Sequence, residues 1–216
     1  MKADSCMYEY LEDNIDSLIV SLTFSDSTNL DKPHYITNIQ MKDRDLAELR
    51  LRTVRVNWAK YARNNKYIRP QYFFFRGNAY MIYQLPEFKL TEKISGNGNV
   101  AERESFGCFY KDYLLISTND ADIKAYIKMI DKGLTKEHDD VYKECIAGLA
   151  PESNCIIFAD LNDIARSPYQ YEHLTTGLLR ENRSFFKDFI MIVQFTHTNG
   201  HLSPNITFIY EGDTDV

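Results

Sequence analysis

The chain has 216 residues, of which 44% are hydrophobic and 26% charged, so it can bury a sizeable core and is not disordered as a whole. Its net charge of −6 at pH 7 argues against nucleic-acid binding, which needs clustered Lys and Arg to displace counterions. The longest strongly apolar run, residues 189–193, is far shorter than the roughly 20 residues of a membrane-spanning helix. The first 12 residues also lack the apolar stretch of a signal peptide.

Two strands and a helix are predicted at the start of the chain. Residues 18–24 and 34–41 are rich in the β-branched and aromatic residues that favour strands. Residues 43–64 indicate a helix, because Asp43 can cap its first turn and no Gly or Pro interrupts it. Its predicted buried stripe is Ala47, Leu51, Val54, Trp58 and Tyr61. An alternating strand, supported by Leu49 and Val56, stays open as an alternative.

An aromatic hairpin is predicted after Pro70. Residues 72–75 and 80–83 flank the dipeptide Gly77-Asn78, which we assign as a two-residue turn. The register that follows is Phe75 with Tyr80, Phe74 with Met81 and Phe73 with Ile82. Because both faces are then apolar, the sequence predicts a central hairpin that is covered on both sides.

A second hairpin and a well-marked helix are predicted in residues 106–134. The hairpin turns at Lys111-Asp112, and Asn119 can cap the helix, which Gly133 ends. The helix has an apolar stripe of Ile123, Tyr126, Ile127 and Ile130. Between the two hairpins, the Gly/Asn run 96–99 is interpreted as a loop tip, since a phosphate-binding loop needs a strand before it and a helix directly after it.

Two helices and a strand are predicted in residues 139–178. The first helix, residues 139–149, starts at Asp139 and stops before Pro151, and residues 155–159 form a strand. In the second helix Ser167 is the cap and Pro168 the first residue. The face of the second helix that we predict to be buried carries Tyr171, Leu174 and Leu178.

The C-terminal hairpin has the strongest turn signal in the chain. Residues 185–198 and 201–211 flank Asn199-Gly200, the dipeptide preferred in two-residue hairpin turns. The register pairs Thr198 with His201, Phe195 with Pro204, Val193 with Ile206, Met191 with Phe208 and Phe189 with Tyr210. The last four of these pairs share one apolar face, which we predict to lie in the core. The opposite face, which carries His201, is predicted to be solvated near the turn.

No catalytic, metal or cofactor motif is supported by the residue pattern, so we predict a protein that is not an enzyme and has no cofactor. His197 and His201 are spaced like metal ligands, but the hairpin register places them on opposite faces. The acidic pairs that include Asp139 and Asp160 are better explained as helix N-caps. No Gly-x-Ser-x-Gly nucleophile motif occurs.

Two further groups are assigned structural roles. The basic cluster interleaved with aromatics resembles that of single-strand binders, but a solvated helix end is the simpler interpretation; it consists of Lys60, Tyr61, Arg63, Lys66, Tyr67 and Arg69. The cysteines lack zinc spacing, and we expect buried or reduced thiols, although three disulfide connectivities are possible; they are Cys6, Cys108, Cys145 and Cys155.

The order of elements in residues 18–210 resembles an uncharacterised family of bacterial envelope-associated proteins, known only as a domain of unknown function. The resemblance is carried by residues 109–118, by the helix that ends at residues 131–135, by residues 153–158 and by the hairpin 189–210. Longer members of that family continue into a propeller-like segment. The resemblance implies a place in the cell envelope or on the periplasmic side, with the signal removed, and it implies no catalytic residues.

These observations predict an α+β fold, a mostly antiparallel sheet with helices packed on it. A single domain is expected over residues 14–212, in two sequential halves, 14–134 and 135–212, which share one core because no Pro/Gly/Ser linker separates them. We expect a non-enzymatic structural or partner-binding module; the alternative is an enzyme with dispersed active-site residues. The last strand is the expected edge for a protein partner or an adjoining domain, at Asn205, Thr207 and Ile209.

Overall fold

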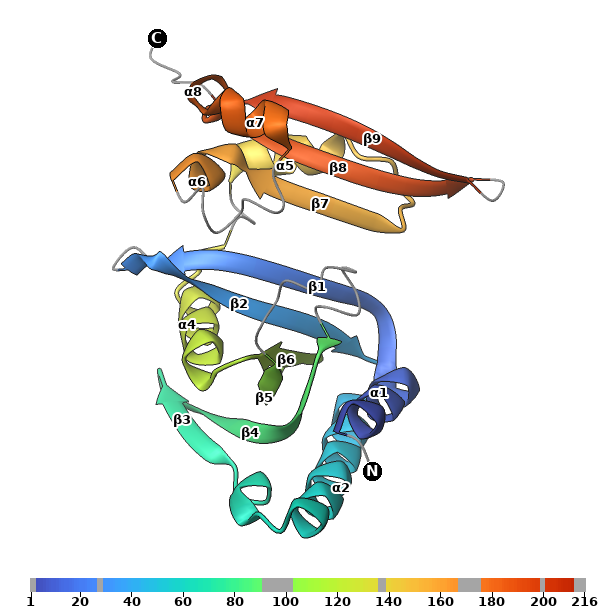
Figure 1. Ribbon diagram of the computed structural model, residues 1–216. Coiled ribbons are helices and arrows are strands. Elements are labelled where there is room, and N and C mark those ends of the chain that lie inside the picture. The colour runs from blue at the N-terminus through green and yellow to red at the C-terminus, as the bar shows by residue number, and fades with distance from the viewer. Residues whose placement is uncertain are drawn as a thin grey trace. The chain divides into compact units, whose positions relative to one another are not determined.

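The computed structural model describes residues 3–26, 29–90, 103–135, 139–166, 176–198 and 201–211. The chain divides into two compact units, Met1–Leu134 (unit 1) and Thr135–Val216 (unit 2), as Figure 1 shows. The boundary lies at the residue that separates the two predicted halves. Both units combine helices with antiparallel strands, which confirms the α+β class. That the halves share one core stays a prediction.

Unit 1 is built on a six-stranded sheet whose neighbouring strands are all antiparallel, in the order β1-β2-β6-β5-β4-β3. Its elements are α1 (Ala3–Asn14), β1 (Ile15–Asp26), β2 (Asn29–Met41), α2 (Arg44–Ala62), the 3₁₀ helix η1 (Asn65–Tyr67), β3 (Gln71–Phe75), β4 (Asn78–Phe88), β5 (Glu104–Tyr110), β6 (Tyr113–Ser117) and α4 (Asp120–Asp131).

Helices cover both faces of this sheet. Met7 and Leu11 of α1 and Leu51 of α2 pack with Ile39 and Ile116 on one face. Ile123 and Ile127 of α4 pack on the other face, against Ile36, Ile82 and Leu115. Helix α1 was not predicted from the sequence, although it buries apolar side chains of its own against the sheet.

The helix predicted over residues 43–64 is confirmed, and the strand alternative is wrong. The side chain of Asp43 accepts a hydrogen bond from the backbone N–H of Leu46 at 3.0 Å, as an N-cap does. The predicted stripe is correct except at its end, because Tyr61 is 59% exposed. The structure buries Arg55 on this face instead, at 2% exposure.

The aromatic hairpin β3–β4 exists, but its predicted turn and position are wrong. Phe75 pairs with Asn78 and Phe73 with Tyr80, so the turn is Arg76-Gly77. Both turn residues have positive φ, 48° and 82°, as a two-residue hairpin turn requires. Strand β3 lies at the edge of the sheet rather than at its centre, and Tyr72 and Phe74 are exposed.

The prediction for residues 106–134 is confirmed. Tyr110 pairs with Tyr113 across the Lys111-Asp112 turn, and Asn119 Oδ1 accepts from Asp122 N at 2.9 Å to cap α4. Gly133 has a φ of +72°, a left-handed conformation suited to the end of a helix. The Gly/Asn run 96–99 lies outside the described residues.

Unit 2 is a three-stranded antiparallel sheet in the order β7-β8-β9, with short helices around it. Its elements are α5 (Asp140–Ala147), β7 (Cys155–Asp160), α6 (Leu161–Arg166), α7 (Gly177–Glu181), α8 (Arg183–Phe186), β8 (Phe189–Thr198) and β9 (His201–Tyr210). Asp139 caps α5 and the strand β7 is present, as predicted.

The helix predicted to begin at Ser167 and to include Leu178 differs from the structure in the part that is described. Residues 167–175, with the predicted cap Ser167 and Pro168, lie outside the described residues. The next helix, α7, starts after Thr176, and it buries Leu179 while Leu178 is 63% exposed. Strand β8 starts at Phe189 rather than at Phe185, because residues 183–186 form the short helix α8.

The register predicted for the C-terminal hairpin is confirmed at every pair, although the turn Asn199-Gly200 itself lies outside the described residues. The predicted core face is wrong. Ile190 and Ile192 are each 1% exposed and pack with Cys145 of α5, whereas Ile206 and Phe208 on the other face are 56% and 42% exposed. Helix α5 therefore covers the face that the sequence predicted to be solvated near the turn.

Candidate functional site

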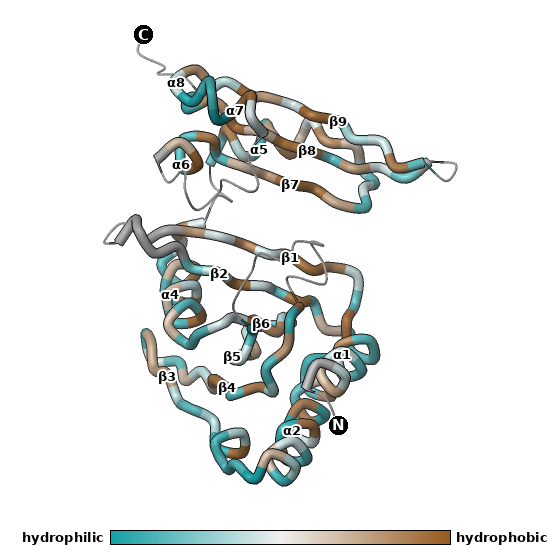
Figure 2. Tube along the Cα trace, in the orientation of Figure 1, coloured by the Kyte–Doolittle hydropathy of each residue, from teal (hydrophilic) through white to brown (hydrophobic). Residues whose placement is uncertain are grey.

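One face of the unit 2 sheet, which we call the open face, is apolar and largely exposed. All three strands contribute to it, as the pairings Ile157–Val193 and Val193–Ile206 show. Ile157, Ile206 and Tyr210 are 46%, 56% and 66% exposed. Figure 2 shows hydrophobic residues along all three strands. The open face consists of Cys155, Ile157, Ala159, Phe189, Met191, Val193, Phe195, Pro204, Ile206, Phe208 and Tyr210.

An aromatic cluster closes one end of the open face. Phe186 of α8 lies 5.6 Å from Phe208 between ring centroids, and Phe189 lies 5.2 Å from both Phe185 and Tyr210. This cluster covers only the end next to α8, since Ile206 and Ile157 are still exposed. Contiguous exposed apolar surface of this kind marks interaction sites in soluble proteins.

Strand β9 is also an edge of this sheet, because it pairs only with β8 among the described strands. The direction of its backbone groups follows from three observations. Phe195 O accepts from Asn154 N, so the carbonyl of Phe195 points toward the β7 side. Glu211 N donates to Asp188 O, which joins β9 to β8 at the other end. Pro204, opposite Phe195, has no N–H to give to β8.

Because backbone groups alternate in direction along a strand, these observations divide β9 into two sets. The N–H and C=O groups of Asn205, Thr207 and Ile209 point toward β8. The outward groups of the edge belong to Ile206, Phe208 and Tyr210, whose side chains also lie on the open face. Contact of Asn205, Thr207 and Ile209 with a partner stays a prediction, and the structure adds that their backbone groups bond within the hairpin.

The histidines and acidic residues that the sequence analysis considered for metal binding or catalysis lie in hairpin and helix-cap positions. His197 pairs with Leu202 and His201 with Thr198, which puts the two histidines on opposite faces, as predicted. Asp160 Oδ1 accepts from Asn162 N at 2.9 Å, a helix-starting contact, as predicted. Among the described residues, no group of three His, Cys, Asp or Glu side chains could hold a metal ion.

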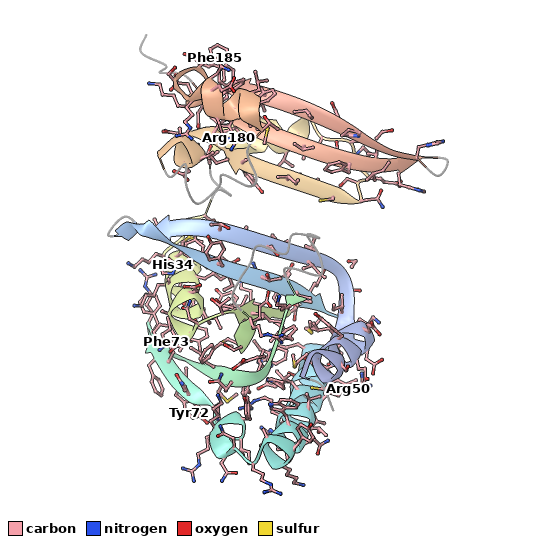
Figure 3. The ribbon with its side chains drawn as sticks, viewed as in Figure 1. His34, Arg50, Tyr72, Phe73, Arg180 and Phe185 are labelled. Atoms are coloured by element: carbon pink, nitrogen blue, oxygen red, sulfur yellow. The ribbon has the colours of Figure 1, made fainter. Side chains whose placement is uncertain are left out.

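A buried polar cluster that sequence reasoning missed lies in unit 1. Asp122 accepts hydrogen bonds from Tyr35 N at 3.0 Å and Ser117 Oγ at 3.1 Å, and its Oδ1 lies 2.7 Å from His34 Nδ1. His34 is labelled in Figure 3. A catalytic triad needs the imidazole between the carboxylate and the nucleophile, whereas here Ser117 contacts the carboxylate. The cluster therefore connects β2, β6 and α4.

All four cysteines are free thiols in the structure. Cys6, Cys108 and Cys145 are buried, as expected, and Cys155 is exposed on the open face. Burial raises the pKa of Cys108 to about 12, and burial also raises the pKa of Cys145. A thiol with a raised pKa supplies little of the reactive thiolate at neutral pH.

Thiol labelling of the native protein at pH 8 should therefore modify one cysteine rapidly, Cys155, and all four only after denaturation. Mass spectrometry of alkylated peptides measures this directly. The variant Cys155→Ser is the control and should leave the native protein without a fast-reacting thiol. Fast native labelling of Cys108 would contradict its burial between the sheet and α4.

Comparison with protein-family models, with curated proteins and with solved structures finds no match to this chain. No described helix is long and apolar enough to cross a membrane.

Proposed function

We propose that the protein is a non-enzymatic binding module whose unit 2 binds another polypeptide by strand addition beside β9. The observation that carries this proposal is the coincidence of an outward backbone edge and an exposed apolar face at Ile206, Phe208 and Tyr210. In strand addition the main-chain hydrogen bonds provide affinity and alternate side chains provide specificity.

The chemistry of the edge describes the partner. Residues 205–210 carry no charged side chain, so the partner strand has no ionic contact to make there. A bound strand would continue the open face if its alternate residues were apolar. The partner is therefore an extended segment of alternating apolar and polar residues, from a separate protein or an adjoining domain. A place in the cell envelope is part of this proposal on the ground of the sequence resemblance alone.

Blocking the outward edge at one residue tests the proposal. The probe is a fluorescent ten-residue peptide of alternating valine and threonine with a lysine at each end. Ile206→Pro removes an outward N–H and should weaken binding of the peptide at least tenfold by fluorescence anisotropy, while Ile206→Val should bind as the wild type does. Bound peptide should leave the alkylation rate of Cys155 unchanged, because Cys155 lies on β7, at the other edge of the sheet.

The variant Thr207→Pro separates edge blocking from loss of the hairpin, because the N–H of Thr207 points toward β8. It should unfold unit 2, whereas Ile206→Pro should leave the β8–β9 amides protected from exchange. Equal binding of the peptide to the wild type and to Ile206→Pro, or no binding at millimolar peptide, would reject strand addition. A wild-type dimer that Ile206→Pro converts to a monomer would identify the partner strand as β9 of a second copy.

A further inference from the structure

A small cavity in unit 1 lies where α2, η1 and the hairpin β3–β4 meet. Its volume is about 310 Å³, at the lower end of the range for small-ligand sites. Tyrosines, two arginines and apolar side chains line it, and one of the tyrosines, Tyr72, is labelled in Figure 3. The full lining is Arg52, Arg55, Val56, Tyr67, Ile68, Pro70, Tyr72, Met81 and Tyr83.

Arg55 is an unusual member of this lining, because it is a buried cation with an unused donor. Only 2% of the residue is exposed. Its Nε donates to Gln84 O at 3.1 Å, and its guanidinium carbon lies 4.4 Å from the centre of the Tyr83 ring. Its Nη2 is buried and has no hydrogen-bond partner in the described part of the chain. Buried polar groups almost always have a partner, and buried charges are normally paired.

Within the described ranges, no carboxylate forms an ion pair with Arg55. Glu48, on the same helix, accepts a hydrogen bond from the hydroxyl of Tyr83 and lies 3.2 Å from Arg44 Nη2. No Asp or Glu occurs among the described residues that line the cavity, whereas Arg52 adds a second cation. Burial lowers the pKa of Arg55 to about 10, so the guanidinium is still charged at neutral pH.

The surroundings extend the positive charge toward solvent. An adjoining hollow shares Ile68 and Pro70 with the cavity and is lined by Lys66 and Arg69 as well. Lys66 and Arg69 belong to the basic cluster that we assigned from the sequence to a solvated helix end. Helix α2 does end there, at Ala62, but Tyr67 is buried and turns toward the cavity rather than into solvent.

We propose that this cavity is a binding site for a small organic anion, a carboxylate or phosphate monoester that carries one planar ring. The anionic group accepts from the guanidinium of Arg55, which lines the cavity, and lies near Arg52, so that it supplies the counter-ion that the buried cation lacks among the described residues. The fork of a guanidinium matches the oxygens of both anions. The ring of the ligand packs among Tyr67, Tyr72 and Tyr83, the three aromatic side chains that line the cavity.

Titration with defined anions tests the site. The probes are phenyl phosphate, benzoate and inorganic phosphate, each added to the full chain at constant ionic strength set with sodium chloride. We expect phenyl phosphate or benzoate to raise the melting temperature of unit 1 in a saturable way, with inorganic phosphate at least tenfold weaker. Whichever ring-bearing anion binds more tightly distinguishes a phosphate site from a carboxylate site.

Substitutions then assign the effect to the cavity. Arg55→Met should abolish the ligand-dependent shift and leave the melting temperature without ligand close to that of the wild type, because it removes an incompletely paired charge. Arg55→Lys should bind at least tenfold more weakly, since an ammonium lacks the planar fork. Lys60→Met, an exposed change of the same charge on the same helix, should bind as the wild type does.

A second variant keeps the test decisive if Arg55→Met does not fold. Arg52→Met changes an exposed residue of the lining and should weaken binding at least fivefold. For a site of this kind we expect a dissociation constant on the order of 1 mM or lower. The absence of a saturable shift with both ring-bearing anions at about 10 mM would therefore overturn the proposal. Equal weakening by Arg52→Met and Lys60→Met would also overturn it, because the effect would then be general charge screening.

Discussion

Replacing Ile192 by alanine is expected to destabilise unit 2 by about 2–5 kcal/mol, the usual range for a large-to-small change in a core. Ile192 is 1% exposed and packs with Ile190 and Cys145 under α5, so its truncation leaves a cavity in a small core. Phe208→Ala should have a much smaller effect. Phe208 is 42% exposed, and the described aromatic contact that it loses is the one with Phe186.

The two units have to be followed separately in this experiment. The single tryptophan, Trp58, lies in α2, so its fluorescence reports the unfolding of unit 1 in urea. Amide exchange at residues 190–194 reports unit 2. Ile206→Ala on the open face is the matched control for Ile192→Ala. Greater loss of protection in Phe208→Ala than in Ile192→Ala would mean that the assignment of the two faces is reversed.

Removing the carboxylate of Asp122 should destabilise unit 1 by about 3–5 kcal/mol, the cost of leaving the partners of a buried charged group without it. The side chain of Asp122 is 6% exposed and holds Tyr35 N, Ser117 Oγ and His34 Nδ1. It also lies in the first turn of α4, where a negative charge is favourable. Asp122→Ala should shift the urea midpoint of Trp58 fluorescence to much lower urea.

The control lies two residues earlier on the same helix. Asp120 forms an ion pair with Lys124 that is partly exposed, and such pairs contribute less than about 1 kcal/mol. Asp120→Ala should therefore shift the midpoint only slightly. Similar midpoints for Asp122→Ala and Asp120→Ala would show that the buried cluster does not connect β2, β6 and α4 as the hydrogen bonds indicate.

The two hairpins that were predicted differently show which local signals are reliable. Asn199-Gly200 allowed a correct register for β8–β9, because Asn and Gly are the residues that two-residue turns prefer. In β3–β4 the turn uses Arg76 and Gly77, and an arginine with a φ of 48° is not suggested by its residue type. The prediction shifted the turn by one residue and therefore the pairing by two.

The candidate sites were less accessible to sequence reasoning. His34 and Asp122 lie 88 residues apart, and no motif joins them. Arg55 follows Val54 in a helix whose apolar stripe we had assigned correctly up to Trp58, yet its burial depends on Tyr83 and Gln84 in β4. The basic cluster was the one signal that could have indicated the cavity, since Lys66, Tyr67 and Arg69 all contribute to the two hollows.

The sequence by itself determined the α+β class, the caps at Asp43, Asn119 and Asp139 and the register of the last hairpin. Each of these depends on interactions within a few residues or across one short turn, so residue type is enough to specify them. Only the tertiary structure decided which face of β8 is buried, that β3 is an edge, and that Arg55 lines a cavity. These features depend on which helix packs on which face, and that choice is set by contacts between segments far apart in the chain.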